Sequence, residues 1–117
     1  MTKGSKEFGA FVRREREKRE IGLREMAKII GVSPTYLSKV ERGEFKEPVE
    51  KKVRAIAKII ECDPEELMAL AGRMPSELAD IIKRNPVEMS ALLRSVNGLS
   101  AEDLTRLAQR ARKTKGD

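Results

Sequence analysis

The side chains with the most evident chemistry lie in residues 33–45, SPTYLSKVERGEF. A serine followed by a proline, as at the start of this segment, is typical of a helix start: the hydroxyl caps free backbone amides and the proline presets the first turn. Helical spacing then places Thr35, Ser38, Lys39 and Arg42 on one side of that helix. Hydroxyls and cations donate hydrogen bonds to phosphate oxygens and to base edges, so this side is predicted to contact a nucleic acid.

The opposite side of the same helix is expected to face the protein core. Leu37 and Val40, with Tyr36 in part, can anchor it to neighbouring helices. Glu41 falls beside this buried edge, where a carboxylate without a partner is costly. Arg16 has the same problem on the apolar side of an earlier helix, so we predict an Arg16–Glu41 ion pair. The alternative is two independent surface charges.

Short helices must position these side chains, because every segment longer than a turn has helical periodicity and none alternates like a strand. The first is expected over residues 5–19, the second after Gly22, and the third from Ser33 to about Arg42. A fourth is expected from near Pro48 and a fifth over residues 64–71. The inward face of the fourth is expected to contain Val49, Val53, Ile56, Ala57 and Ile60.

The sequence of the second half of the chain predicts about three short amphipathic helices, which begin after Pro75, Asn85 and Ser100. Their apolar stripes are Leu78, Ile81 and Ile82; Leu92, Leu93 and Val96; and Leu104, Leu107, Ala108 and Ala111. Three short helices cover one another only partly. Residues 73–113 are therefore predicted to form a dimer interface, or else to pack on their own N-terminal domain. The final run RLAQRARK could contact phosphates, although a solvated helix end is the simpler interpretation.

The positive charge is confined to the first half of the 117-residue chain. Residues 1–54 contain 15 Lys and Arg against 9 Asp and Glu, whereas residues 55–117 contain 10 against 10, so the N-terminal half carries the whole net charge of +6. Such an excess in one segment is typical of a polyanion-binding surface, although basic helices also serve solubility.

A helix-turn-helix is indicated by Gly31, which suits a left-handed helix end between two short helices. Many helical hairpins share this feature, but here the surrounding sequence adds to it. The segments GLREMAKIIGVSPTYLSKVERG (22–43) and AIAKIIECDPEEL (55–67), with Pro48 between them, resemble the Cro/phage-repressor (Xre) type helix-turn-helix family. The resemblance covers roughly residues 7–70.

This resemblance implies an all-α fold in which residues 5–72 form a five-helix DNA-binding domain. In the family the third helix enters the major groove of double-stranded DNA and the second lies across the backbone. Members usually bind as symmetric homodimers to palindromic sites, whose half-sites are about 34 Å apart.

The resemblance also assigns roles to individual residues. Positions that contact bases fall on Pro34, Thr35, Tyr36, Ser38 and Lys39, and a phosphate-binding position falls on Ser33. Because Pro34 has no polar side chain, base contact shifts to the other four. Lys39 can donate to guanine and Thr35 can offer a methyl group to thymine. Tyr36 is either a phosphate ligand or a core residue.

Further cations are candidates for phosphate contact. Leu23 replaces the phosphate-binding glutamine of many members, so Arg24 takes over that contact or the contact is lost. The other candidates are Lys28, Arg42 and Lys46, and the cluster Lys51, Lys52 and Arg54. The loop 44–47 is favoured because it follows the third helix. Each could instead be an ordinary solvated charge.

Composition argues against other classes of protein. The chain has no histidine and one cysteine, Cys62, so neither a zinc cluster nor an internal disulfide is expected, and no apolar run is long enough to cross a membrane. No enzymatic activity, metal or cofactor is expected, and a small-molecule effector is not identified.

We expect a cytoplasmic transcriptional repressor that binds DNA as a homodimer. The alternative is an antitoxin-like protein that also binds a partner protein through its C-terminal helices.

Overall fold

The computed structural model describes residues 5–116, and within this range the chain forms helices and no strands. The helices are α1 (Lys6–Lys18), α2 (Leu23–Ile30), α3 (Pro34–Glu41), α4 (Glu50–Ile59), α5 (Pro64–Leu70), α6 (Ser76–Arg84), α7 (Pro86–Val96) and α8 (Ala101–Thr114). The prediction of an all-α fold is confirmed.

The chain divides into two compact units, Met1–Ser76 and Glu77–Asp117. The first contains α1 to α5, and the second contains α7, α8 and nearly all of α6. The roles expected for residues 5–72 and 73–113 remain predictions.

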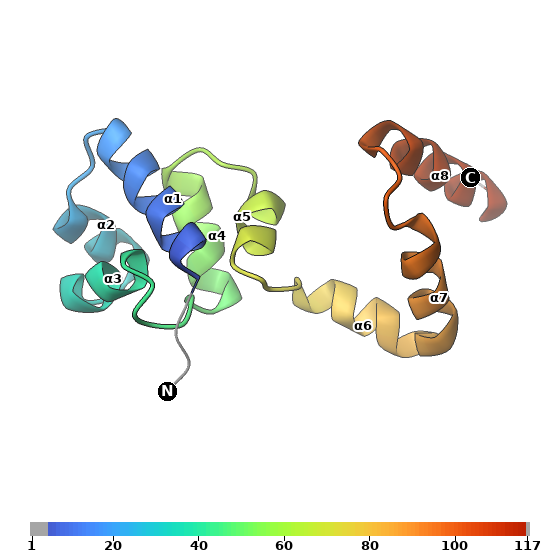
Figure 1. Ribbon diagram of the computed structural model, residues 1–117, viewed down its shortest axis with the longest axis horizontal. Coiled ribbons are helices and arrows are strands. Elements are labelled where there is room, and N and C mark those ends of the chain that lie inside the picture. Colours follow the sequence, from blue (N-terminus) through green and yellow to red (C-terminus); the bar gives the residue numbers. More distant parts are fainter. Residues whose placement is uncertain (1–4, 117) are drawn as a thin grey trace. The chain divides into compact units, whose positions relative to one another are not determined.

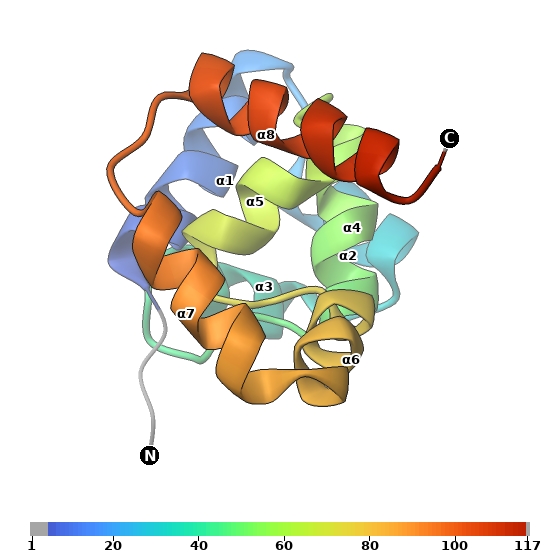
Figure 2. The ribbon, with the colours of Figure 1, turned by 90° about the vertical axis from the view of Figure 1, so that its right-hand side faces the viewer.

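The first unit is built around one apolar core. Helix α3 packs on α1 and α2, while α5 packs on α4 and α1, and α2 also contacts α4 (Figure 1, Figure 2). The largest fully buried side chains come from all five helices: Phe8, Val12, Met26, Leu37, Val40, Val53, Ile56, Ile60, Leu67 and Met68. This core fixes the position of α3, because Leu37 and Val40 are both essentially inaccessible to solvent.

The ends of α2 and α3 follow the local signals in the sequence. Gly31 ends α2 with a φ angle of 76°, a left-handed conformation that side chains with a Cβ rarely adopt. Ser33 then caps α3, since its Oγ accepts a hydrogen bond of 3.0 Å from the Tyr36 amide, and Pro34 occupies the first turn. The turn between the two helices is therefore specified by three adjacent residue types.

One expected core residue is exposed. Val49 was predicted to face inward from α4, but it is 60% exposed and precedes the helix as its N-cap. Its backbone is extended, with φ −64° and ψ 162°, because α4 begins only at Glu50. Helical periodicity therefore does not extend to Val49, and the core side of α4 begins at Val53.

The second unit lacks a buried core among its described residues. None of the residues of α6, α7 and α8 is buried. Seven large apolar side chains of these helices are at least 40% exposed: Leu78, Ile81, Val87, Leu92, Leu93, Leu104 and Leu107. The apolar stripes expected from the sequence thus remain available for packing.

Candidate nucleic-acid interface

A buried ion pair fixes α3 against α1. The Arg16 guanidinium donates to both carboxylate oxygens of Glu41, with Nε–Oε2 at 2.8 Å and Nη2–Oε1 at 2.9 Å. A third bond runs from Arg16 Nη1 to the Ile21 carbonyl oxygen at 2.9 Å. The two charged side chains are only 9% and 4% exposed. Hydrogen bonding to Glu41 raises the pKa of Arg16 above its ordinary value. The structure thus brings together the two residues expected to pair.

A close approach of two backbones positions the end of α3 as well. Gly9 of α1 is buried against the carbonyl groups of Val40 and Glu41. A Cβ at Gly9 would lie 2.5 Å from the Val40 carbonyl oxygen, far inside van der Waals contact. Sequence reasoning missed this residue, because an isolated glycine inside a helical pattern does not reveal which backbone lies next to it.

The opposite side of α3 borders an open hollow. Arg24, Thr35, Ser38 and Arg42 line it together, with Pro34 and the residues Gly22 and Leu23 at the start of α2. Arg24, Thr35 and Arg42 are exposed, and Ser38 is half-buried. Two guanidinium groups and two hydroxyls from α2 and α3 therefore share one surface. Lys28 and Lys46 are exposed but do not line this hollow.

Lys39 and Tyr36 do not line this hollow, and each contacts the Phe45 ring. The Lys39 ammonium lies 5.0 Å from the centre of the Phe45 ring, at a distance suited to a cation–π contact. The Tyr36 and Phe45 rings are 6.0 Å apart and inclined by 42°. Both rings pack against the core, and desolvation raises the pKa of Tyr36. Phe45 therefore positions Lys39 at the edge of α3.

Sequence reasoning missed the role of Phe45. The chain contains only 3% aromatic residues, so an aromatic in the charged loop after α3 was a detectable signal. The packing of Tyr36 favours its interpretation as a core residue over that of a phosphate ligand.

Two predicted phosphate ligands already have intramolecular contacts. Ser33 Oγ accepts from the Tyr36 amide, which leaves the hydroxyl proton free to donate to an anion. Arg42 pairs with Glu44, Nε to Oε2 at 2.8 Å, and both side chains are about half exposed. Exposed pairs are worth about 0–1 kcal/mol, so a phosphate can displace Glu44 at little cost.

Two of the three cations in the basic cluster on α4 make hydrogen bonds within the fold. Lys52 Nζ donates to the Ile30 carbonyl oxygen at 2.6 Å and so satisfies the C-terminal end of α2. Arg54 Nε donates to Glu50 at 3.0 Å. Only Lys51 of these three cations is exposed. Lys52 and Arg54 are thus held by protein contacts in this structure.

Residues 73 and 76 donate hydrogen bonds to the loop that follows α3 and to the first residue of α4. Arg73 Nη2 donates to the Glu47 carbonyl oxygen at 2.5 Å, and the Ser76 amide donates to Glu50 Oε1 at 3.1 Å. The Ser76 amide and Arg54 together lower the pKa of Glu50. These contacts fix the backbone around Lys46, the predicted phosphate ligand in this loop.

Other kinds of site lack support in the described range. No group of three or more His, Cys, Asp or Glu side chains within residues 5–116 is arranged to hold a metal ion. None of the helices described there combines the length and apolar composition needed to cross a bilayer.

The fold and this surface define a helix-turn-helix protein, with α2 and α3 as the two helices of the motif. Comparison with known families agrees: the family model described as a helix-turn-helix domain matches residues 7–71. The chain therefore belongs to the helix-turn-helix domain family, and its type is that of the Cro/phage-repressor (Xre) regulators it resembles.

Two known proteins are similar in sequence to part of this chain. An uncharacterised HTH-type transcriptional regulator of Mycobacterium tuberculosis is 38% identical over 74 residues, which cover 62% of this chain and 52% of that protein. The 10 kDa protein of the ImmF control region of Bacillus phage phi105 is 38% identical over 58 residues, covering 50% of this chain and 63% of that protein. The matched region thus spans about half the length of the mycobacterial relative.

Solved structures with similar chains include two further proteins. The clp gene regulator ClgR from Corynebacterium glutamicum is 31% identical, with a TM-score of 0.47, over 57% of this chain and 87% of that chain. A chain of the SinR–SinI complex is 17% identical, with a TM-score of 0.49, over 94% of this chain and 99% of that chain.

Proposed function

We propose that the protein is a transcription regulator that binds specific sequences in double-stranded DNA with α3 in the major groove. Its simplest action is repression by occupying a promoter. The observation that carries this proposal is the division of α3 into two sides. Leu37, Val40 and Glu41 hold the helix in the first unit, while Thr35 and Ser38 border an open hollow between two arginines.

Base contacts are assigned to the outward residues of α3. Lys39 can donate to the O6 and N7 acceptors of guanine, and the Thr35 methyl group can contact the methyl group of thymine. Ser38 and Tyr36 are the remaining candidates. Ser38 lies in the hollow beside Thr35, whereas the Tyr36 ring packs partly against the core.

Phosphate contacts are assigned to the groups around this helix. The Ser33 hydroxyl, at the positive end of the α3 dipole, forms one anion site. Arg24 and Arg42 flank the hollow, and Lys28 and Lys46 lie outside it. These contacts supply affinity that depends on salt and carries no sequence information.

The regulator is proposed to act as a homodimer on a palindromic operator. The support is the second unit, whose helices expose leucine and isoleucine side chains and bury none of them. Two recognition helices related by a two-fold axis would contact half-sites about 34 Å apart.

The first test is selection of bound sequences from a random duplex DNA library, followed by salt-titrated binding. We expect a palindromic motif bound on the order of 10³-fold more tightly than random DNA, with affinity that falls steeply as salt rises. Equal affinity for selected and random duplexes would contradict sequence-specific regulation.

The assignment of α3 is tested with Thr35→Ala and Lys39→Ala in the full chain. Losing a base contact costs about 1–3 kcal/mol, so each variant should lower the ratio of specific to random binding by about tenfold. Lys58→Ala on the exposed side of α4 is the matched control and should leave the ratio unchanged. If Thr35→Ala and Lys39→Ala behave like the control, α3 does not contact the bases.

The second candidate function is an antitoxin-like protein that binds DNA and also a partner protein. The same exposed apolar side chains of α6, α7 and α8 favour it, because they fit a different protein as well as a second copy. The mass of the purified chain in solution distinguishes these two candidate functions. A dimer supports the homodimeric regulator, and a stable monomer favours the partner-binding alternative.

A further inference from the structure

Helix α8 from Arg106 onward, together with its C-cap residue Lys115, carries a group of cations that the proposed contacts of α3 do not use. Arg106, Arg110, Arg112, Lys113 and Lys115 lie in residues 104–116, a segment with no Asp or Glu in its sequence. All five residues are exposed. The basic end of α8 is thus separate from the positive charge of the first 54 residues.

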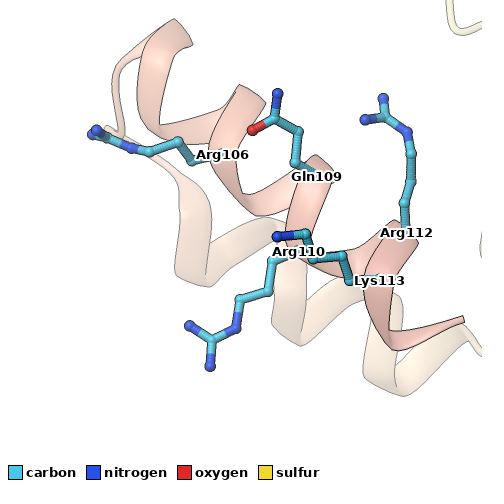
Figure 3. Close-up of a pocket in the computed structure, with 5 residues that line it drawn as sticks. All are labelled: Arg106, Gln109, Arg110, Arg112 and Lys113. Carbon is cyan, nitrogen blue, oxygen red and sulfur yellow. The ribbon is translucent and has the colours of Figure 1, made fainter. Parts of the chain in front are cut away.

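Four of these residues surround one shallow hollow on α8. Arg106, Arg110, Arg112 and Lys113 line it together with Gln109. Figure 3 shows the five side chains extending outward from this single helix. The lining offers three guanidinium groups, one ammonium group and one amide, all of which can donate hydrogen bonds, and it contains no carboxylate.

Helical periodicity places three of the four cations of this hollow away from the apolar side of α8. Leu104 and Leu107, with Ala108 and Ala111, repeat along one side of the helix. Arg106, Arg110 and Lys113 follow the opposite side at intervals of four and three residues. The leucine side can therefore pack in a dimer while the basic side stays exposed to solvent.

Compensation of the helix dipole accounts for only part of this charge. Arg112 and Lys113 lie in the last turn of α8, where cations are favoured. Arg110 lies two positions before Arg112, and Arg106 lies in mid-helix, where it pairs with Glu102 and Asp103. The acidic residues thus end at Asp103, and the cations beyond Arg106 have no carboxylate next to them along α8.

The chemistry of the group fits a phosphate backbone better than a lipid surface. Guanidinium groups match phosphate oxygens in a two-pronged geometry. From Arg106 to Lys113 the helix rises by about 10 Å, which equals about three spacings between successive phosphates on one DNA strand. The apolar positions beside the last cations are alanines, and a helix without large apolar residues there inserts poorly into a bilayer.

We propose that the basic side of α8 is a second DNA-binding surface, which contacts the phosphates of duplex DNA independently of sequence. This inference rests on the proposed DNA-binding function of the first unit. The peptide chain joins α8 to that unit, so a contact made by α3 raises the effective concentration of DNA near α8.

The test uses the full chain and a long random-sequence DNA duplex. Three cations are removed from α8 in the variant Arg110→Gln/Arg112→Gln/Lys113→Gln. The matched control, Lys83→Gln/Arg84→Gln/Arg94→Gln, removes three exposed cations from α6 and α7. Affinity is measured over a series of salt concentrations, and the slope of log K against log salt gives the number of phosphate contacts.

Each lost phosphate contact lowers the magnitude of this slope by about 0.9, so the α8 variant should lose about 2 to 3. The control should lose less than one. Equal slopes for the α8 variant and the control would overturn the α8 surface and leave the proposed function standing. Binding of the wild type to anionic lipid vesicles, with no change of the DNA slope in the α8 variant, would have the same consequence. If the wild-type chain binds no duplex DNA, both proposals fail.

Discussion

At the scale of single residues, the Arg16–Glu41 ion pair fixes the position of α3. Burying two charged groups costs desolvation free energy. Their mutual attraction offsets this cost only if the geometry is good and the remaining donors are satisfied. Here both carboxylate oxygens accept from the guanidinium, and a third donor reaches the Ile21 carbonyl oxygen. The pair is therefore a strict constraint on the position of α3: any shift of the helix breaks charged hydrogen bonds in a buried site.

Glu41→Gln is expected to lower the free energy of unfolding by about 3–5 kcal/mol, because it leaves a buried guanidinium without its counter-charge. Urea denaturation followed by circular dichroism measures this change. Glu44→Gln, which removes the exposed partner of Arg42, is the matched control and should cost at most about 1 kcal/mol. A similar small effect of both variants would contradict the role assigned to Glu41.

Some residue roles could be predicted from sequence and others could not. Arg16 and Glu41 could, because each interrupts an otherwise apolar stripe and so signals a buried charge. The bond from Lys52 to the Ile30 carbonyl oxygen joins residues 22 positions apart, and helical spacing alone gave no sign of it. The contact between Lys39 and Phe45 likewise depends on the path of the loop after α3.

At the scale of elements, the position of α3 depends on how closely α1 can approach it. The backbones of the two helices meet at Gly9, where the absence of a Cβ lets the carbonyl groups at the end of α3 lie against α1. A larger residue there has to separate the two helices. Because Glu41 also lies at this contact, such a separation would disturb the buried ion pair.

Gly9→Ala should therefore destabilise the protein, even though alanine is the better helix former by about 1 kcal/mol. Overpacking typically costs about 1–3 kcal/mol, and the displaced α3 should bind selected DNA more weakly. Denaturation and DNA binding are measured on the same variant. Gly22→Ala is the control: a Cβ at Gly22 would have its nearest neighbour at 4.0 Å, so its effect should stay below about 1 kcal/mol. A Gly9→Ala variant more stable than the wild type would refute the close approach.

The starts of α3, α5 and α8 could be predicted well because capping is local. Ser33, Asp63 and Ser100 each accept a hydrogen bond from an amide two or three residues further on, as their sequence contexts indicate. Val49 was misplaced because an apolar pattern does not show where a helix begins, and α4 starts two residues after Pro48. A serine or aspartate cap would have marked that start, and α4 has none.

At the scale of the whole molecule, the two units differ in what holds them together. The first has a continuous buried core to which all five of its helices contribute. The helices of the second leave their apolar side chains largely exposed in this chain. Exposed leucines and isoleucines in these helices favour packing against a partner surface, and the proposed homodimer would supply one of the same composition.

Leu92→Asp/Leu93→Asp is expected to convert a dimer into a monomer of 13.2 kDa. The two leucines are 51% and 49% exposed in the single chain, so charging them should disturb the isolated chain little. In a symmetric dimer four leucines lose their apolar contacts, which should cost more than about 3 kcal/mol and raise the dimer dissociation constant by more than about 100-fold.

Sedimentation equilibrium of the wild type and the variant measures this change directly. Ala91→Asp/Ser95→Asp places the same two charges outside the apolar stripe Leu92, Leu93 and Val96 of α7, at exposed positions, and should remain dimeric. Loss of the dimer should also weaken binding to a palindromic operator far more than binding to a single half-site, because only the dimer joins two recognition helices. A wild-type chain that sediments as a monomer at all accessible concentrations, or a Leu92→Asp/Leu93→Asp variant that stays dimeric, would reject this interface.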